Sequence, residues 1–244
     1  MAQVRLNIKL LDMTQNPVAL IYAACRQCYS GKFAGDIFAE PSQDPHKQEE
    51  FIRKVAASGH ESPLEHVKFT FALEGVSRAL THQLVRHRIA SYSQQSQRYV
   101  RASAFNYIIP PSIEEDKSLC GKFVKIMDDI QKHYDEMLEA FKAKGKAGEE
   151  ANQDVRFLLP QAAETKIVVT MNCRELIHFF EQRCCSRAQW EIRCLASKML
   201  EICQMNLPSV FSAVGAKCEK LSYCPESKQF SCGKYPVKDE VIKG

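Results

Sequence analysis

The sequence has no long hydrophobic run among its 244 residues. No apolar stretch approaches the ~20 residues that a membrane-spanning helix needs, so we predict no contact with a membrane. The start of the chain also lacks the basic, apolar and small-residue order of a secretory signal, and we expect a cytoplasmic protein. Hydrophobic residues make up 45% and charged residues 25% of the chain. This composition is typical of a folded globular protein and excludes disordered and low-complexity classes.

A complete disulfide framework is also missing. The chain has eleven cysteines, an odd number, and without an export signal we expect reduced thiols. Cys25 and Cys28 form a CxxC, but inside a predicted helix and not at its start, where the dipole would lower the thiol pKa. We interpret them as core thiols, with a redox pair as the alternative. Cys218, Cys224 and Cys232 are spaced too loosely for a typical zinc site, and we predict no metal.

Acidic residues are absent from residues 76–101. This segment carries five arginines and no carboxylate, a local charge of +5 in a chain whose net charge is +4. Unpaired guanidinium groups predict a bound anion such as a phosphate; the alternatives are pairing with distant glutamates or a solvated face. The polar residues 91–99 follow, with hydroxyl and amide groups suited to a base or sugar. The segment therefore favours a nucleotide site.

Hydrophobic periodicity predicts strands and helices in mixed order. Strands are predicted at residues 4–10, 69–73 and 166–171. Helices are predicted at residues 18–29, near 51–58, and at 77–88, 113–143, 173–184 and 189–205. Asn16, Ser77 and Ser112 are the expected N-caps, and residues 31–46, 91–99 and 142–154 are expected to be irregular. On the predicted helix at 77–88, Arg78, His82 and Arg86 share one face. This order indicates an α+β fold, a single domain with a central, mostly antiparallel sheet flanked by helices.

Four blocks of the sequence resemble the flavin-dependent thymidylate synthase family. Residues 86–96, Arg-His-Arg followed by seven residues and serine, match the family signature in full. GHESPLEHVKFTF (59–71), MNCRELIHFFEQR (171–183) and AQWEIR (188–193) resemble three further blocks, in the order that the family has them. The resemblance implies a catalytic domain at residues 1–215, followed by a cysteine-containing tail at 216–244.

The resemblance implies an activity as well. Members of the family methylate dUMP to dTMP in de novo dTMP biosynthesis, taking the carbon from 5,10-methylenetetrahydrofolate and releasing tetrahydrofolate. FAD reduced by NADPH is the hydride donor, and no cysteine nucleophile is needed. The resemblance also implies a homotetramer whose active sites are shared between subunits.

The functional residues implied by the resemblance fall into two sets. FAD contacts are implied for Ser62, Arg86, His87, Arg88, Gln94, Asn172, Arg174 and His178. Contacts to dUMP are implied for Gln83, Arg86, Gln94, Gln95, Ser96, Gln97, Arg98, Arg156 and Arg183. Arg183 is the implied catalytic residue, because it matches an arginine that stabilises charge on the uracil ring. Ser93 and Gln94 stand where many relatives have Asn and Glu. His60 resembles a histidine linked to flavin positioning, with a helix-cap role as the alternative.

Two other classes of protein compete with this interpretation. A nucleic-acid-binding module would explain the arginines, but it usually interleaves aromatic side chains, and here only Tyr92 and Tyr99 qualify. A metal- or redox-sensing protein would explain the cysteines, but it leaves residues 86–96 without a role. We therefore predict a flavoenzyme without a nucleic-acid partner, and flavin absorbance would separate it from both alternatives.

Overall fold

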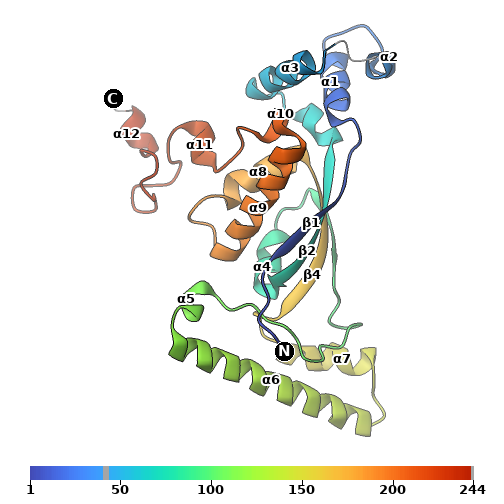
Figure 1. Ribbon diagram of the computed structural model, residues 1–244, viewed down its shortest axis with the longest axis vertical. Coiled ribbons are helices and arrows are strands. Elements are labelled where there is room, and N and C mark those ends of the chain that lie inside the picture. Colours follow the sequence, from blue (N-terminus) through green and yellow to red (C-terminus); the bar gives the residue numbers. More distant parts are fainter. Residues whose placement is uncertain (41–43, 243–244) are drawn as a thin grey trace. The chain divides into compact units, whose positions relative to one another are not determined.

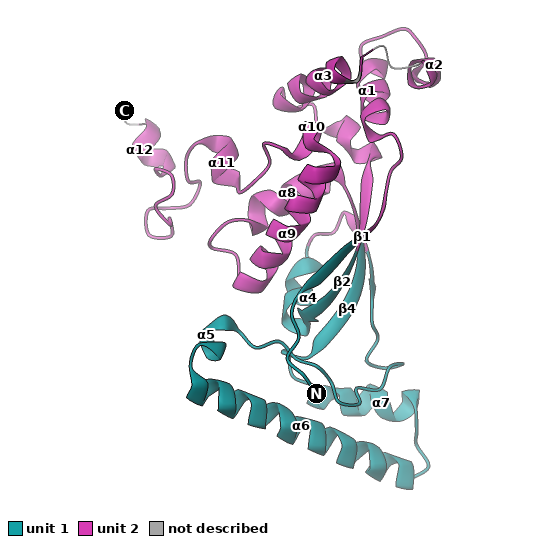
Figure 2. Cartoon of the chain, viewed as in Figure 1, with its two compact units in different colours: residues 1–9, 72–86, 92–169 teal, residues 10–71, 87–91, 170–244 magenta. Residues whose placement is uncertain are grey.

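The computed structural model describes residues 1–40 and 44–242. The chain separates into two compact units whose segments alternate along the sequence (Figure 2). Unit 1 comprises residues 1–9, 72–86 and 92–169, and unit 2 comprises residues 10–71, 87–91 and 170–244. Part of the segment expected to be irregular, residues 41–43, lies outside the described residues. The expected boundary between residues 215 and 216 stays a prediction.

A four-stranded antiparallel sheet has the strand order β1-β2-β4-β3. Figure 1 labels its first three strands in this order, β1, β2 and β4. Its strands are β1 (Asn7–Met13), β2 (Lys68–Ser77), β3 (Ala90–Gln94) and β4 (Glu164–Asn172). Each strand has residues in both units. The antiparallel sheet and the mixed α+β class are therefore confirmed. The predicted first strand begins three residues late, at Asn7, because the residues before it pair with the segment around Tyr107 instead.

The strand β3 corrects the prediction that residues 91–99 are irregular. Its half-buried residues alternate with exposed ones, but they include polar Tyr92 and Gln94, so no hydrophobic alternation was visible in the sequence. The Tyr92 hydroxyl donates to the Leu84 carbonyl, 2.8 Å away, at the end of the helix α4 (Arg78–Leu84). The Ser77 cap of α4 is confirmed, since its hydroxyl oxygen accepts from the Leu80 N–H at 3.0 Å.

Because α4 ends at Leu84, the predicted helix at 77–88 is too long. Arg86 lies beyond the helix and does not share a face with Arg78 and His82. The tight turn after α4 is closed by the Arg86 N–H, which donates to the Gln83 carbonyl at 3.3 Å. The arginines of the basic segment are therefore not aligned along one helix: Arg78 is in α4, and the others lie in turns and loops before and after β3.

The remaining helices of unit 1 follow β3. They are α5 (Pro111–Glu114), α6 (Lys117–Ala143), α7 (Glu149–Val155) and the 3-10 helix η2 (Arg156–Leu158). The long helix expected at 113–143 is α6, but the cap is Asp116 and not Ser112: its carboxylate accepts from the N–H groups of Ser118 and Leu119. Helix α7 corrects the prediction of an irregular segment at 142–154, whose mixed charge hid the helical pattern.

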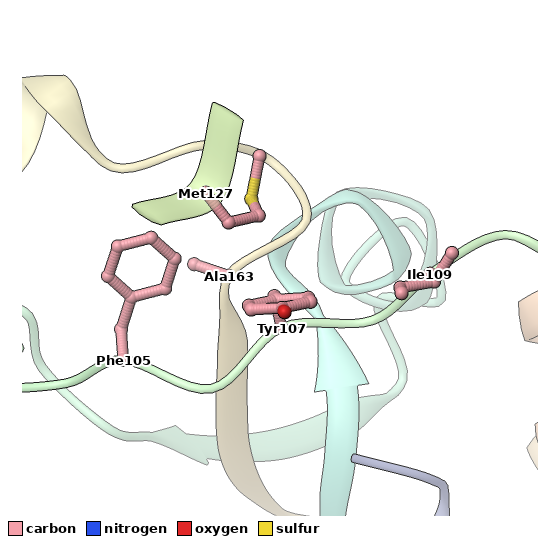
Figure 3. Packing of buried hydrophobic residues seen from close by; sticks show 5 residues of the cluster. All are labelled: Phe105, Tyr107, Ile109, Met127 and Ala163. Atoms are coloured by element: carbon pink, nitrogen blue, oxygen red, sulfur yellow. The ribbon is translucent and has the colours of Figure 1, made fainter. Parts of the chain in front are cut away.

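A cluster of buried hydrophobic residues forms part of the core of unit 1 (Figure 3). Met127 of α6 packs with Phe105, Tyr107, Ile109 and Ala163, and all five side chains are buried. A second cluster along the same helix contains Tyr134 and Leu138, packed with Ala151 and Val155 of α7. These buried contacts hold α7 against α6.

Most helices belong to unit 2. They are α1 (Pro17–Gln27), α2 (Ala34–Ala39), α3 (Pro45–Ala57), the 3-10 helix η1 (Ser62–His66), α8 (Cys173–Arg183), α9 (Trp190–Asn206), α10 (Pro208–Phe211), α11 (Lys217–Leu221) and α12 (Lys238–Ile242). The predictions for α1, α8 and α9 are confirmed, whereas α2 lies in a segment expected to be irregular. Asn16 precedes α1 in a left-handed conformation, with φ of 49°, and its side chain does not cap the helix.

The cysteines are free thiols. Burial and the neighbouring Cys28 raise the pKa of the Cys25 thiol to about 11, which disfavours a reactive thiolate in the CxxC. Cys218 and Cys224 of the tail are buried, while Cys232 is exposed. In the described part of the chain, no helix is long and apolar enough to cross a membrane.

Candidate functional site

The expected site residues divide between the two units. Unit 1 holds Gln83, Arg86, Gln94, Gln95, Ser96, Gln97, Arg98 and Arg156, most of which are expected to bind the nucleotide. Unit 2 holds Ser62, His87, Arg88, Asn172, Arg174, His178 and Arg183, most of which are expected to bind the flavin. Each group has its own geometry.

Two arginines of unit 1 lie near each other without a carboxylate. Burial and the charge of Arg156 lower the pKa of Arg78. Both side chains are half-buried, and neither forms an ion pair with any residue that the structure describes. Two partly desolvated guanidinium groups with no counter-ion are suited to an anion with two or more charges. Arg78 was not among the expected site residues, although the absence of acidic residues from 76–101 was a signal for it.

The polar segment after β3 offers both backbone and side-chain groups. The Gln94 amide donates to the hydroxyls of Thr81 and Thr165, each 3.2 Å away, which leaves its carbonyl oxygen as the group that can accept from a ligand. The Ser96 hydroxyl oxygen accepts from the N–H groups of Arg98 and Tyr99. The Gln95 N–H donates to the Lys166 carbonyl at 2.8 Å. The turn is therefore held in shape from within unit 1.

Arg98 is held by α7. Its guanidinium forms an ion pair with Glu149 and lies 5.5 Å from the centre of the Tyr99 ring. Its carbonyl accepts from the Asn152 amide at 3.2 Å. Helix α7 therefore fixes both the backbone and the side chain of Arg98. The sequence analysis did not anticipate this contact, because it predicted residues 142–154 to be irregular.

Unit 1 does not gather all of its expected residues in one cavity. A pocket of about 200 Å³ is lined by Gln95, Ser96 and Gln97, while Arg98 and Arg156 lie outside its lining. Arg86 is exposed and has no ion-pair partner among the residues described.

In unit 2, the structure brings together two expected site residues that are far apart in sequence. The Arg183 Nε–H donates to Nε2 of His87 at 3.1 Å. His87 is only 4% exposed, and its Nδ1 faces Oε1 of Glu175, 3.3 Å away. Burial, followed by the charges of Arg183 and His178, lowers the pKa of His87 to about 4. His87 is therefore a neutral imidazole at physiological pH.

Arg183 is half-buried and has no carboxylate partner in the described residues. Burial lowers the pKa of its guanidinium, which still stays charged at any physiological pH. A fixed cation beside a neutral histidine is available to stabilise negative charge on a ligand.

A cleft of about 390 Å³ lies in unit 2 along the exposed side of α8. Asn172, Arg174 and His178 line it, with the apolar side chains of Ile89 and Ile177. The Asn172 side chain also caps α8, since its oxygen accepts from the Glu175 N–H at 2.8 Å. The expected flavin residues Ser62 and Arg88 are exposed and lie outside the lining of this cleft.

The charges of this cleft limit which part of a flavin fits. Arg174 forms ion pairs with Glu65 and Glu61, and Lys220 with Glu61 and Glu181. Both cations are thus matched by carboxylates, so a pyrophosphate would meet no unpaired charge here. A planar polar ring system fits better, because two isoleucines, the His178 imidazole and the Asn172 amide line the cleft beside four glutamates, and its volume is typical of ligand sites. The exposed Arg88, which has no acidic partner among the described residues, is suited to the phosphates.

His60 lies next to Tyr29 in unit 2. The Tyr29 hydroxyl is 3.2 Å from Nδ1 of His60, and the two rings meet edge to face with centres 5.6 Å apart. Its ring is therefore held by another side chain of the unit. The helix-cap role is also confirmed: the His60 N–H donates to the Val55 carbonyl at 3.3 Å, after Gly59 with its φ of +85° at the end of α3.

Comparisons with known proteins find relatives that span most of the chain. Residues 9–209 match the family model described as thymidylate synthase complementing protein. The flavin-dependent thymidylate synthase of Nitratidesulfovibrio vulgaris is 52% identical over 237 residues, covering 96% of this chain and 97% of that protein. The enzyme of the same name from Clostridium tetani is 46% identical and covers 93% of each chain.

A solved structure is similar in fold. It is the crystal structure of the UMP/dUMP methylase PolB from Streptomyces cacaoi bound with 5-Br dUMP, which matches with a TM-score of 0.73. The match covers 86% of this chain and 95% of that chain at 20% sequence identity, so it bears on the fold alone.

Proposed function

Because this chain belongs to the flavin-dependent thymidylate synthase family, we propose that it methylates dUMP to dTMP in de novo dTMP biosynthesis. The carbon comes from 5,10-methylenetetrahydrofolate, which leaves as tetrahydrofolate. The observation that carries the proposal is the half-buried Arg183, held by His87 and without a carboxylate partner among the residues described. A guanidinium in that setting stabilises the negative charge that develops on the uracil ring.

The arginines of unit 1 bind the nucleotide. Arg156 and Arg98 provide the positive charge for the dUMP phosphate, and Arg78 adds to it because it shares its surroundings with Arg156. Gln83, Arg86 and the segment from Gln94 to Gln97 contact the base and sugar through amides, the Ser96 hydroxyl and backbone N–H groups. That a protein of similar fold binds a brominated dUMP supports this part of the proposal.

The flavin is FAD. Asn172, Arg174 and His178 hold its ring portion in the cleft of unit 2, Arg88 and Arg86 bind its phosphates, and Ser62, His87 and Gln94 complete the set. When bound and reduced by NADPH, FAD supplies the hydride. The chain itself orients the two ligands and stabilises charge.

No cysteine takes part in the chemistry. Burial raises the pKa of the Cys173 and Cys203 thiols far above the usual range, and it raises the pKa of Cys184 to about 11. These thiols are protonated at neutral pH and are poor nucleophiles. This supports a mechanism in which no covalent bond forms between the protein and the uracil.

The protein assembles as a cytoplasmic homotetramer with active sites shared between subunits. Charge supports this assembly, because Arg86, Arg98, Arg156 and Arg183 together exceed what a dUMP phosphate and one uracil ring need from a single chain. A mixture of Arg98→Ala and Arg183→Ala subunits, each inactive alone, regains activity after subunit exchange if the two arginines of one site come from different chains. A fully active monomer would contradict the shared site.

The activity is tested with the purified protein, FAD, NADPH, dUMP and methylenetetrahydrofolate. We expect a yellow protein with oxidised-flavin absorbance, NADPH oxidation, dTMP and tetrahydrofolate. Dihydrofolate as the folate product would contradict the mechanism. Failure to bind flavin would contradict the assignment of FAD.

A further inference from the structure

One face of α8 carries residues that meet a single buried imidazole. Glu175, Phe179 and Arg183 lie at i, i+4 and i+8, so they are stacked on the same side of the helix. The His87 ring packs on this face, 4.9 Å from the centre of the Phe179 ring and edge-on to it. His87 is thus in contact with both polar ends of the stripe.

The chemistry of arginine decides which tautomer His87 adopts. A guanidinium has donors only, so the Arg183 Nε–H requires an unprotonated Nε2 on His87. The single proton of the neutral imidazole must then be on Nδ1. Nδ1 faces Glu175 Oε1 at 3.3 Å. This oxygen can accept a hydrogen bond from Nδ1–H whether the carboxyl group is ionised or protonated.

The carboxyl group of Glu175 is buried next to His87. Its side chain is 7% exposed, and burial raises the pKa of its carboxyl, with a smaller opposing effect from His178. A buried carboxyl is costly unless it is hydrogen-bonded. His178 and Arg183 also lie against His87, and the Glu175 carboxyl is the acidic group that faces its Nδ1, so Glu175 is placed to select the tautomer.

We propose that Glu175 is a positioning residue: it keeps the proton of His87 on Nδ1, so that Nε2 accepts from Arg183 and holds the guanidinium in one orientation. The inference rests on the proposed function, in which Arg183 stabilises charge on the uracil ring. Without Glu175, the imidazole can adopt the Nε2–H tautomer, which sets two donors against each other and turns Arg183 away.

The first test reads the tautomer directly. In protein labelled with ¹⁵N-histidine, long-range ¹H–¹⁵N correlations distinguish the two neutral tautomers, and a His87→Gln variant assigns the signal among the seven histidines. We expect the Nδ1–H form in the wild type and a mixture in Glu175→Gln, whose amide can accept from or donate to Nδ1. An Nε2–H or doubly protonated His87 in the wild type at pH 7.5 would overturn the proposal.

The second test is a double-mutant cycle on the turnover of the FAD-loaded enzyme. Glu175→Gln should lower kcat roughly 10- to 100-fold, as the loss of a group that orients a functional side chain does. In the Arg183→Ala background the same change should cost less than about twofold, because the residue it acts through is gone. The control Glu201→Gln, an exposed glutamate of α9, should leave kcat unchanged.

The outcomes separate the two levels of inference. Suppose that the wild type makes dTMP, but Glu175→Gln lowers kcat by the same factor in the wild-type and Arg183→Ala backgrounds. Glu175 would then only stabilise the fold, and this inference alone would be overturned. A wild type that makes no dTMP would contradict the proposed function. A Glu175→Gln variant that unfolds is replaced by Glu175→Asp, for which a smaller loss of kcat and a retained Nδ1–H signal are expected.

Discussion

Arg98, which is expected to bind a phosphate, forms an ion pair with Glu149 at the start of α7. Both side chains are partly exposed, and exposed ion pairs contribute only ~0.2–1 kcal/mol. A phosphate dianion competes successfully with such a partner. The ion pair with Glu149 therefore weakens nucleotide binding slightly, because it must be broken when the phosphate binds.

The variant Glu149→Gln removes this competition. Since up to ~1 kcal/mol of ion pairing no longer has to be lost, we expect the Kd for dUMP to fall by up to about fivefold. Isothermal titration at low salt measures it. The control is Glu150→Gln, the next residue, which pairs with Lys146 instead. Weaker dUMP binding by Glu149→Gln alone would mean that Glu149 orients Arg98 for the ligand.

Replacing Arg183 should separate turnover from flavin binding. We expect Arg183→Ala to lower kcat by about 10²–10³, the usual effect of losing one donor to a developing charge, ~2.7–4 kcal/mol. Its flavin content, measured by absorbance, should stay near that of the wild type. Arg187→Ala, which removes a nearby exposed arginine paired with Glu226, is the control. Equal loss of flavin and activity would mark Arg183 as a structural residue.

The neutral state of His87 should make stability depend on pH. Its folded pKa of about 4 lies below the ordinary value of 6.5, so the unfolded chain takes up the proton first as pH falls. The contribution is complete above about pH 6.5 and is lost progressively toward pH 4, by at most ~3 kcal/mol in the free energy of unfolding. Urea denaturation between pH 7.5 and 4.5 measures it. His87→Gln should flatten this slope, and an unchanged slope would refute the assignment.

The tail cysteines should be dispensable for catalysis. Replacing Cys218, Cys224 and Cys232 together by serine should leave kcat nearly unchanged. We expect lower thermal stability, because Cys218 and Cys224 are buried and serine brings a hydroxyl to each place. Metal analysis of the wild type completes the test: bound zinc, together with unfolding of the triple variant, would contradict the prediction.

Gly75 of β2 should tolerate no side chain. Its φ is +65°, and a Cβ would lie 2.0 Å from the Arg5 carbonyl oxygen. We expect Gly75→Ala to destabilise the fold by ~2–4 kcal/mol, measured by chemical denaturation. The control Gly121→Ala is in the exposed second turn of α6, where a Cβ meets nothing within 4 Å. It should stabilise by up to ~1 kcal/mol, since alanine is the better helix former.

Local sequence patterns were enough to predict most of the regular elements and the family. The antiparallel strands β2 and β4, the helices α8 and α9, and the Ser77 cap were all predicted, because hydrophobic periodicity and capping are local properties. The block from Arg86 to Ser96 indicated the family for a similar reason, because all of its residues lie within one short segment of the sequence.

Relationships between residues that are distant in the sequence follow only from the folded structure. Polar residues formed β3 because the neighbouring β4 supplied its hydrogen-bond partners, and α7 formed because it packs on α6. Arg183 and His87 are 96 positions apart in sequence, and Arg78 and Arg156 are also distant. Whether such arginines meet a carboxylate, an imidazole or one another depends on folding, since burial and charge act through space and not along the chain.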